Sequence, residues 1–334
     1  MHPTLAAIQA GAPTEPNLDV TLLAWAALGA AVVAMLAFDL LVFGRGRKPT
    51  LRESVAWTGV WTVCALAFGA WLTLTVGSEV GGEFLAGYLL ERSLSFDNLF
   101  VFAVIFGFFA VPVALQARAL AWSIALALVL RLVFILIGAA LLEAFHLTIY
   151  LFGALLLFTG YKLARHKPEH MDVSKNPVLR LMRRRVPMTE AYSGTRLSVR
   201  EGGRRVATPL LAVLVVIAAT DLMFAIDSIP AIYAVTSVPF IVFAANAFAL
   251  LGMRALYFAL VGLMERFVYL SYGLAVLLGF VGVKMLLTDV WKMPTWLSLA
   301  VIVAVLAVTA LLSLRADRRA RRATADAERE PVAA

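Results

Sequence analysis

The sequence predicts an all-α, polytopic membrane protein. Of its 334 residues, 62% are hydrophobic and 15% are charged, whereas soluble globular proteins have about 45–50% apolar and about 25% charged residues. The mean hydropathy of +0.89 is typical of a chain whose solvent is lipid. This composition excludes a soluble enzyme, a disordered chain and a small disulfide-rich domain. The chain has one cysteine, Cys64, which excludes a disulfide within it.

Nine apolar stretches are long enough to span a bilayer, which requires about 20 residues per helix. We expect membrane helices at 20–43, 55–76, 84–110, 119–142, 147–164, 209–235, 240–264, 267–287 and 296–314. The predicted parts are an extracytoplasmic N-terminus (1–19), two leading helices (20–83), a three-helix repeat (84–164), a basic cytoplasmic loop (165–207), a second three-helix repeat (208–287), a last helix (288–314) and a cytoplasmic tail (315–334).

The basic residues predict the orientation in the plasma membrane. Of 29 Lys and Arg residues, 21 lie in three polar segments: four in 44–53, eleven in 165–205 and six in 315–329. Cytoplasmic loops carry such an excess, so we expect the N-terminus outside and the C-terminus in the cytoplasm. Because the charge flanks membrane spans, we expect no nucleic-acid partner despite the net charge of +8. We interpret the long basic loop as a solvated linker, with lipid-headgroup contact as the alternative.

Two blocks of the sequence match each other in five features that occur in the same order. Each has two carboxylates six residues apart with a small polar residue after them, then Val-Pro, an arginine in the next span and a terminal Gly-x-Lys. The members are Glu91, Asp97, Asn98, Val111, Pro112, Arg131, Gly160 and Lys162, matched by Asp221, Asp227, Ser228, Val238, Pro239, Arg254, Gly282 and Lys284. Because each block contains three spans, the copies are predicted to be inverted repeats, which are typical of transporters.

Five carboxylates lie within apolar spans, where each costs roughly 2.5–3.5 kcal/mol on insertion scales. They are Asp39, Glu91, Asp97, Asp221 and Asp227. Such groups are tolerated when they face one another, a cation or water, so they indicate a functional site. Residues six apart are turned by about 120° on an unbroken helix. Since Pro230 disturbs a helix and the first motif is rich in polar residues, we expect broken helices at both acidic motifs.

Carboxylate, amide and backbone oxygens together form a hard site suited to Mg²⁺, Ca²⁺ or Mn²⁺. Asn98 and Asn246 add neutral oxygens. Two other interpretations stay open: a proton relay, and structural ion pairs between the acids and the membrane-embedded cations. Those cations are Arg92, Arg131, Arg254 and Lys284. Asp39, near Arg45 at the cytoplasmic end of its span, is expected to snorkel or pair there.

Enzyme chemistry is not expected. The four histidines lie outside the spans or at their edges, and the sequence has no P-loop and no candidate Ser–His–Asp grouping. We therefore expect no catalytic residues and no covalent cofactor.

The two acidic motifs, from Tyr88 to Phe102 and from Asp221 to Ile232, resemble the signatures of the TerC family. These are integral membrane proteins named for tellurium resistance. Shorter stretches fit as well, so the resemblance covers about 38–314. The resemblance implies export of a divalent cation, chiefly Mn²⁺, by a secondary transporter, with protons as a candidate driving ion. The alternatives are a membrane scaffold in a metal-stress or protein-biogenesis complex, and an exporter of small organic solutes.

The resemblance also implies site residues. The implied metal ligands are Glu91, Asp97, Asn98, Asp221, Asp227 and Asn246. From the charges embedded in the spans we additionally expect gating or charge-pairing roles for Asp39, Arg131, Arg254 and Lys284. One departure concerns Ala218, which stands where the family usually has Glu. Because residues three apart share a helix face, that Glu would lie beside Asp221. Ala244 and Ala245 likewise replace a Thr-Ser pair before Asn246, so we expect a weaker or altered site.

Overall fold

The computed structural model describes residues 20–43, 49–165, 173, 176–201, 203–260, 269–291 and 293–327, without the side chains of residues 42, 43, 97, 100, 227, 260, 270, 271 and 317–327. Its elements in order are α1 (Leu22–Phe43), α2 (Leu51–Thr75), α3 (Ser78–Phe108), α4 (Val113–Ala144), α5 (Leu147–Arg165), α6 (Pro177–Arg185), β1 (Ser198–Glu201), β2 (Arg204–Ala207), α7 (Pro209–Tyr233), α8 (Pro239–Leu251), α9 (Met253–Leu260), α10 (Leu270–Leu286) and α11 (Thr295–Ala327).

The structure is the all-α, polytopic membrane bundle that the sequence predicts. Within the described ranges, seven helices are long and apolar enough to cross a membrane. The α3 helix is not among them because its 31 residues include five that are charged. The described part of α10 has 17 residues. Helices thus lie at all nine predicted stretches, while the number of spans stays a prediction.

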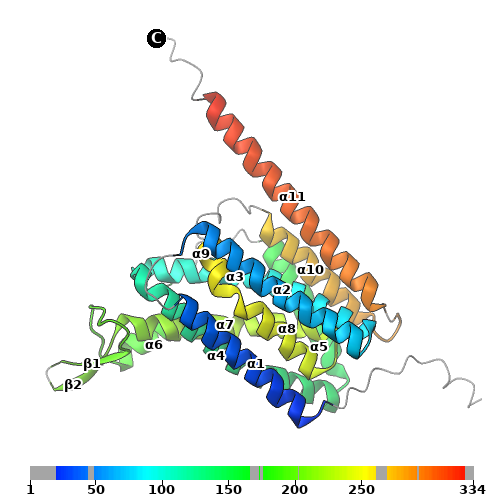
Figure 1. Cartoon of the computed structure of the whole chain (residues 1–334), viewed down its shortest axis with the longest axis horizontal. Helices are drawn as coiled ribbons and strands as arrows, with labels where there is room; N and C mark the ends of the chain where they lie inside the picture. The colour runs from blue at the N-terminus through cyan, green and yellow to red at the C-terminus, as the bar shows by residue number, and fades with distance from the viewer. Residues whose placement is uncertain are drawn as a thin grey trace, which may run out of the picture.

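Each helix of one predicted repeat packs against a helix of the other repeat (Figure 1). Contacts run between α3 and α8, between α4 and α7, and between α5 and α10. The first helix of one block therefore packs against the second helix of the other, the second helix against the first, and the third helix against the third. In two blocks related by a twofold axis, a contact between the first helix of one and the second of the other is matched by the equivalent contact between the second and the first. The packing agrees with inverted repeats, which stay a prediction.

The α8 helix forms the centre of the bundle. Every residue from Ile241 to Leu251 is buried, because α1, α2, α3 and α4 all pack against this helix. Outer helices instead expose large apolar side chains, among them Leu41, Val63 and Leu311. An apolar exterior of this extent is typical of a surface that lipid covers.

The prediction of broken helices at the acidic motifs is wrong. Both α3 and α7 continue through their motifs as α-helix. Two small polar side chains bond within their helix: Ser93 donates to the Leu89 carbonyl at 2.5 Å and Thr220 to the Val216 carbonyl at 2.8 Å. This bonding to the preceding turn leaves the backbone ladder intact. Pro230 lies near the end of α7, where it interrupts little of the helix.

The discontinuity lies instead at Gly252, between α8 and α9. Arg92 of α3 occupies this point and donates from Nη1 to the Ala249 carbonyl at 2.8 Å. A side chain at position 252 would meet Arg92, because a Cβ there would lie 2.9 Å from Nη1. The missing side chain at Gly252 therefore lets a buried cation bond a carbonyl at the end of α8, where the helix dipole is negative.

The basic loop is more than a linker. It contains α6 and an antiparallel hairpin in which Val199 of β1 pairs with Val206 of β2. The apolar face of α6 buries Leu179 and Met182, and the Tyr192 hydroxyl donates to the Phe109 carbonyl at 2.8 Å. The loop is thereby fixed to the end of α3.

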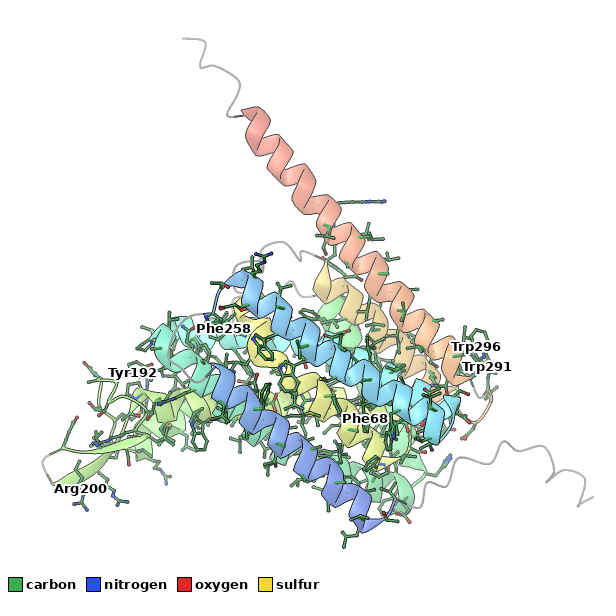
Figure 2. The ribbon with its side chains drawn as sticks, in the orientation of Figure 1. Phe68, Tyr192, Arg200, Phe258, Trp291 and Trp296 are labelled. Carbon is green, nitrogen blue, oxygen red and sulfur yellow. The ribbon has the colours of Figure 1, made fainter. Side chains whose placement is uncertain are left out.

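The two ends of the bundle differ in chemistry. Figure 2 shows Trp291 and Trp296 together at one end and Arg200 of the hairpin protruding at the other. Both tryptophans are at least half exposed, as is usual for aromatic residues at a membrane surface. The direction of these ends in the cell stays a prediction.

Replacing Gly282 with alanine is expected to destabilise the contact between α5 and α10. A Cβ at this position would lie 2.9 Å from the Gly153 carbonyl oxygen, a backbone atom that cannot move aside. We expect Gly282→Ala to lower the free energy of unfolding by about 1–3 kcal/mol through overpacking. The measurement is the thermal midpoint of the detergent-purified protein.

Gly279→Ala is the matched control on the same helix, because a Cβ at Gly279 meets no described atom within 4 Å. Alanine favours helix over glycine by about 1 kcal/mol, so this variant should be as stable as the wild type or more so. Equal midpoints for both variants would contradict the close approach of the two helices.

Candidate cation site

Side chains from four helices meet at one buried point, the guanidinium of Arg131 in α4. Its Nη1 donates to Glu91 Oε1 of α3, and to Asn246 Oδ1 of α8 at 2.5 Å. Its Nη2 lies 3.6 Å from Asp221 Oδ1 of α7. The exposed fraction of the Arg131 and Glu91 side chains is 0%, and that of Asp221 is 3%. We name these four residues the Arg131 cluster.

The cluster lies where the two predicted repeats meet. Glu91 and Asp221 occupy equivalent positions of the two acidic motifs, and the packing of α3 on α8 and of α4 on α7 brings them to one place. Transporters built from inverted repeats hold their substrate at such a junction. Two of the predicted carboxylate ligands and one predicted amide ligand are therefore close together.

The oxygen of Asn246 is held toward Arg131. Asn246 Nδ2 donates to the Val242 carbonyl one turn earlier, at 2.9 Å, so Oδ1 faces the cluster. Asp221 is less well satisfied, because neither of its oxygens accepts a hydrogen bond from a described residue. Two carboxylates and one guanidinium leave a formal charge of −1 in a place from which water is excluded.

Two further polar residues lie about two turns along the same helix faces. Asn98 follows Glu91, and Ser228 follows Asp221, by seven residues, which is a rotation of about −20° on an α-helix. Both residues are 2% exposed. Asn98 Nδ2 has no hydrogen-bond partner among the described residues, whereas Ser228 lies beside the Glu91 carboxylate. Sequence reasoning selected Asn98 and missed Ser228, although the repeat aligns the two.

A second buried ion pair joins α1 to α9. Arg254 Nη2 lies 2.9 Å from Asp39 Oδ2 and also donates to the Asp39 carbonyl, and the Trp61 indole lies beside the same carboxylate. Asp39 is 1% exposed because the aromatic ring and α9 cover it. Of the two expected alternatives, snorkelling and pairing, the structure therefore shows pairing, with Arg254 as the partner; Arg45 lies outside the described residues.

The other predicted site residues are placed as follows. Lys284 of α10 interacts electrostatically with Glu83 of α3, away from the Arg131 cluster. Asp97 lies in α3 and Asp227 in α7, but their side chains are outside the described part of the structure. Among the side chains that are described, no three His, Cys, Asp or Glu residues gather closely enough to hold a metal ion.

The structure shows ion pairs for Glu91 and Asp39, while the roles of these carboxylates stay predictions. Each carboxylate faces a buried arginine from another helix. The two pairs differ in surroundings. Arg254 faces Asp39 of the leading helix α1, whereas Arg131 contacts oxygens from three helices, two of them in equivalent positions of a repeat. The Arg131 cluster is thus the place that can bind a cation from several sides.

Comparison with known proteins agrees with the fold. The sequence model of the integral membrane protein TerC family matches residues 76–321. The uncharacterized membrane protein STKORF319 of Myxococcus xanthus is 45% identical over 304 residues, which cover 91% of this chain and 95% of that protein. No solved structure matches the chain.

Two other relatives also match most of the chain. The Escherichia coli K12 protein named "Putative membrane-bound redox modulator Alx" is 42% identical over 307 residues, which cover 89% of this chain and 96% of that protein. The uncharacterized membrane protein Mb2742 of Mycobacterium bovis is 42% identical over 270 residues, which cover 79% of this chain and 68% of that protein.

Replacing Asp39 with leucine is expected to destabilise the fold, because Arg254 then loses its buried counter-ion. Removal of one partner from a buried pair costs about 3–5 kcal/mol. We expect a lower thermal midpoint for Asp39→Leu, and a midpoint closer to the wild type for the double variant Asp39→Leu/Arg254→Met, which removes both charges. A double variant no more stable than the single one would contradict the pairing.

Proposed function

Since this chain belongs to the TerC family of integral membrane proteins, we propose that it is a secondary transporter that exports a divalent cation, with Mn²⁺ as the first candidate. The proposal rests on the Arg131 cluster. Carboxylates at equivalent positions of two motifs, together with an amide oxygen, surround one buried positive group where the two blocks meet. A site that selects a guanidinium by its oxygen atoms also suits a hard metal cation.

The ligand chemistry favours an ion of the Mg²⁺, Ca²⁺ and Mn²⁺ class. Carboxylate and amide oxygens are the ligands that these ions prefer. Glu91, Asp221 and Asn246 form the proposed first set. Ser228 supplies an oxygen beside Glu91, and Asn98 supplies one about two turns along α3 from Glu91. Asp97 and Asp227 are proposed ligands on the strength of the sequence motifs. Ala218 deprives the site of one anionic oxygen, and the proposal therefore anticipates modest affinity.

The surrounding charges have proposed mechanical roles. Asp39 and Arg254 join α1 to α9 beside the break at Gly252, so this pair is suited to gate the end of the pathway. Protons are the proposed driving ion, because carboxylates are the groups that carry protons in membrane pumps and exchangers. We propose a plasma-membrane location with the N-terminus outside, on the basis of the three basic segments.

A relative's name refers to redox modulation. Thiol–disulfide chemistry within a chain needs two cysteines, and this sequence has one. Export of a redox-active divalent ion offers a route by which such a membrane protein alters redox balance without a redox group of its own. This link between the relative's name and ion export is part of the proposal.

A second candidate function is a membrane scaffold in a metal-stress or protein-biogenesis complex. The observation that favours it is the pairwise neutralisation of Glu91 by Arg131 and of Asp39 by Arg254. Charges that neutralise one another also serve to fix helix positions. In that case, neutralising the acids changes folding or partner binding, and the protein moves no ion.

Flux of Mn²⁺ into proteoliposomes of the purified protein tests the proposal. We expect flux from the wild type and a loss of at least about tenfold in Glu91→Gln and in Asp221→Asn, because each change removes an anionic ligand. Measurements with and without a pH gradient show whether protons drive the movement. The double variant Asp97→Asn/Asp227→Asn tests the two acids that the sequence alone selects.

Glu79→Gln is the matched control, because Glu79 lies on the same helix as Glu91 but is exposed near its beginning. This variant should transport like the wild type. Folded wild-type protein that moves none of Mn²⁺, Mg²⁺, Ca²⁺ and Zn²⁺ would sink the transporter proposal and favour the scaffold.

A further inference from the structure

The geometry points to Arg131 as a tethered counter-cation, a positioning residue that fills the cation site while the site is empty and that an incoming divalent ion must displace. This inference rests on the proposed function and adds to it how the site is regulated. Arg131 would then set the affinity for the ion and the ease of its release.

The first argument is competition for the same atoms. The Nη1 group of Arg131 bonds oxygens of Glu91 and Asn246, and Nη2 faces Asp221. These oxygens are the ligands proposed for the divalent ion. A guanidinium and a metal ion cannot both bind them, because two like charges at contact distance repel strongly in a medium of low dielectric constant.

The second argument is charge. Within the Arg131 cluster, Glu91 and Asp221 carry a formal charge of −2, and Arg131 reduces it to −1. For these residues, a divalent ion in place of the guanidinium brings the sum to zero, whereas an ion beside the guanidinium brings it to +1. Burial of uncompensated charge is unfavourable. Exchange is therefore favoured over joint occupancy.

The third argument is that Arg131 fills the site incompletely. Asp221 is 2% exposed, yet neither of its oxygens receives a hydrogen bond from the described residues, and Nη2 of Arg131 stops 3.6 Å short. A buried carboxylate left in this state costs free energy. An ion that binds both Glu91 and Asp221 removes that cost, which gives it an advantage over the tethered cation.

Arg254 differs from Arg131 in the partner that the structure shows for it. Arg254 occupies the equivalent position of the second repeat, where it lies 2.9 Å from the Asp39 carboxylate and donates to the Asp39 backbone carbonyl. Asp39 belongs to the leading helix α1 and is not among the proposed ligands. Arg131 is therefore the arginine that faces the proposed ligands and is placed to exchange.

Mn²⁺ binding to the full-length protein in nanodiscs, measured by calorimetry, tests the inference. We expect Arg131→Gln to bind Mn²⁺ more tightly than the wild type by roughly 5- to 150-fold, the usual range for coupled equilibria, and to release it more slowly in flux assays. Arg131→Lys should bind with intermediate affinity, because an ammonium cannot bond three oxygens in one plane as a guanidinium does. If Arg131→Gln fails to fold, the Mn²⁺ affinity of Arg131→Lys still tests the inference.

Free guanidinium ion, added to a variant that lacks the Arg131 side chain, gives a second readout. In Arg131→Ala, millimolar guanidinium should weaken Mn²⁺ binding and raise the thermal midpoint, whereas the same concentration of Na⁺ should do neither. The wild type and Arg118→Gln should not respond, because Arg118 lies on the same helix but is exposed.

The outcomes separate this inference from the proposed function. Mn²⁺ flux by the wild type, combined with unchanged or weaker Mn²⁺ affinity in Arg131→Gln and Arg131→Lys, would overturn the counter-cation and leave the transporter standing. Absence of Mn²⁺, Mg²⁺ and Ca²⁺ binding in the wild type and in every folded variant would overturn both. Tighter binding by the Arg131 variants, reversed by guanidinium in Arg131→Ala, supports the inference.

Discussion

The bundle depends on keeping charged groups inside lipid without leaving them unpaired. Arg131 meets this constraint by binding oxygens from three other helices, and these helices include members of both predicted repeats. A guanidinium suits this position because it presents several donors in one plane. The packing of α3 on α8 and of α4 on α7 meets the same requirement, because it brings the matching acids, Glu91 and Asp221, to one cation, Arg131.

Structure and proposed activity use the same contacts. A fully satisfied ion pair would hold the helices rigidly, whereas Asp221 lacks hydrogen bonds from the described residues and leaves the Arg131 cluster ready to accept further positive charge. The Asp39–Arg254 pair differs, because Arg254 also donates to the backbone carbonyl of Asp39. We infer that the protein separates this ion pair near the leading helices from an exchangeable one between the repeats.

Much of this organisation could be predicted from the sequence. The composition predicts a membrane protein, and the motif spacing predicts that Glu91 and Asp221 are equivalent. Burial in lipid indicates Arg131, among other embedded cations, as a partner for the acids. The helix break could not be placed, because it depends on Arg92 reaching the Ala249 carbonyl beside Gly252. Pairing of Asp39 with Arg254 was equally hidden, since 215 residues separate them and only the packing of α1 near α9 joins them.

An experimental structure of the protein with Mn²⁺, in which anomalous scattering locates the metal, tests the central claim most directly. The account predicts a Mn²⁺ ion bound by Glu91, Asp221 and Asn246, with the Arg131 guanidinium moved away from Glu91. A metal ion bound elsewhere, or Arg131 still bonded to Glu91 and Asn246 in a protein loaded with Mn²⁺, would contradict it.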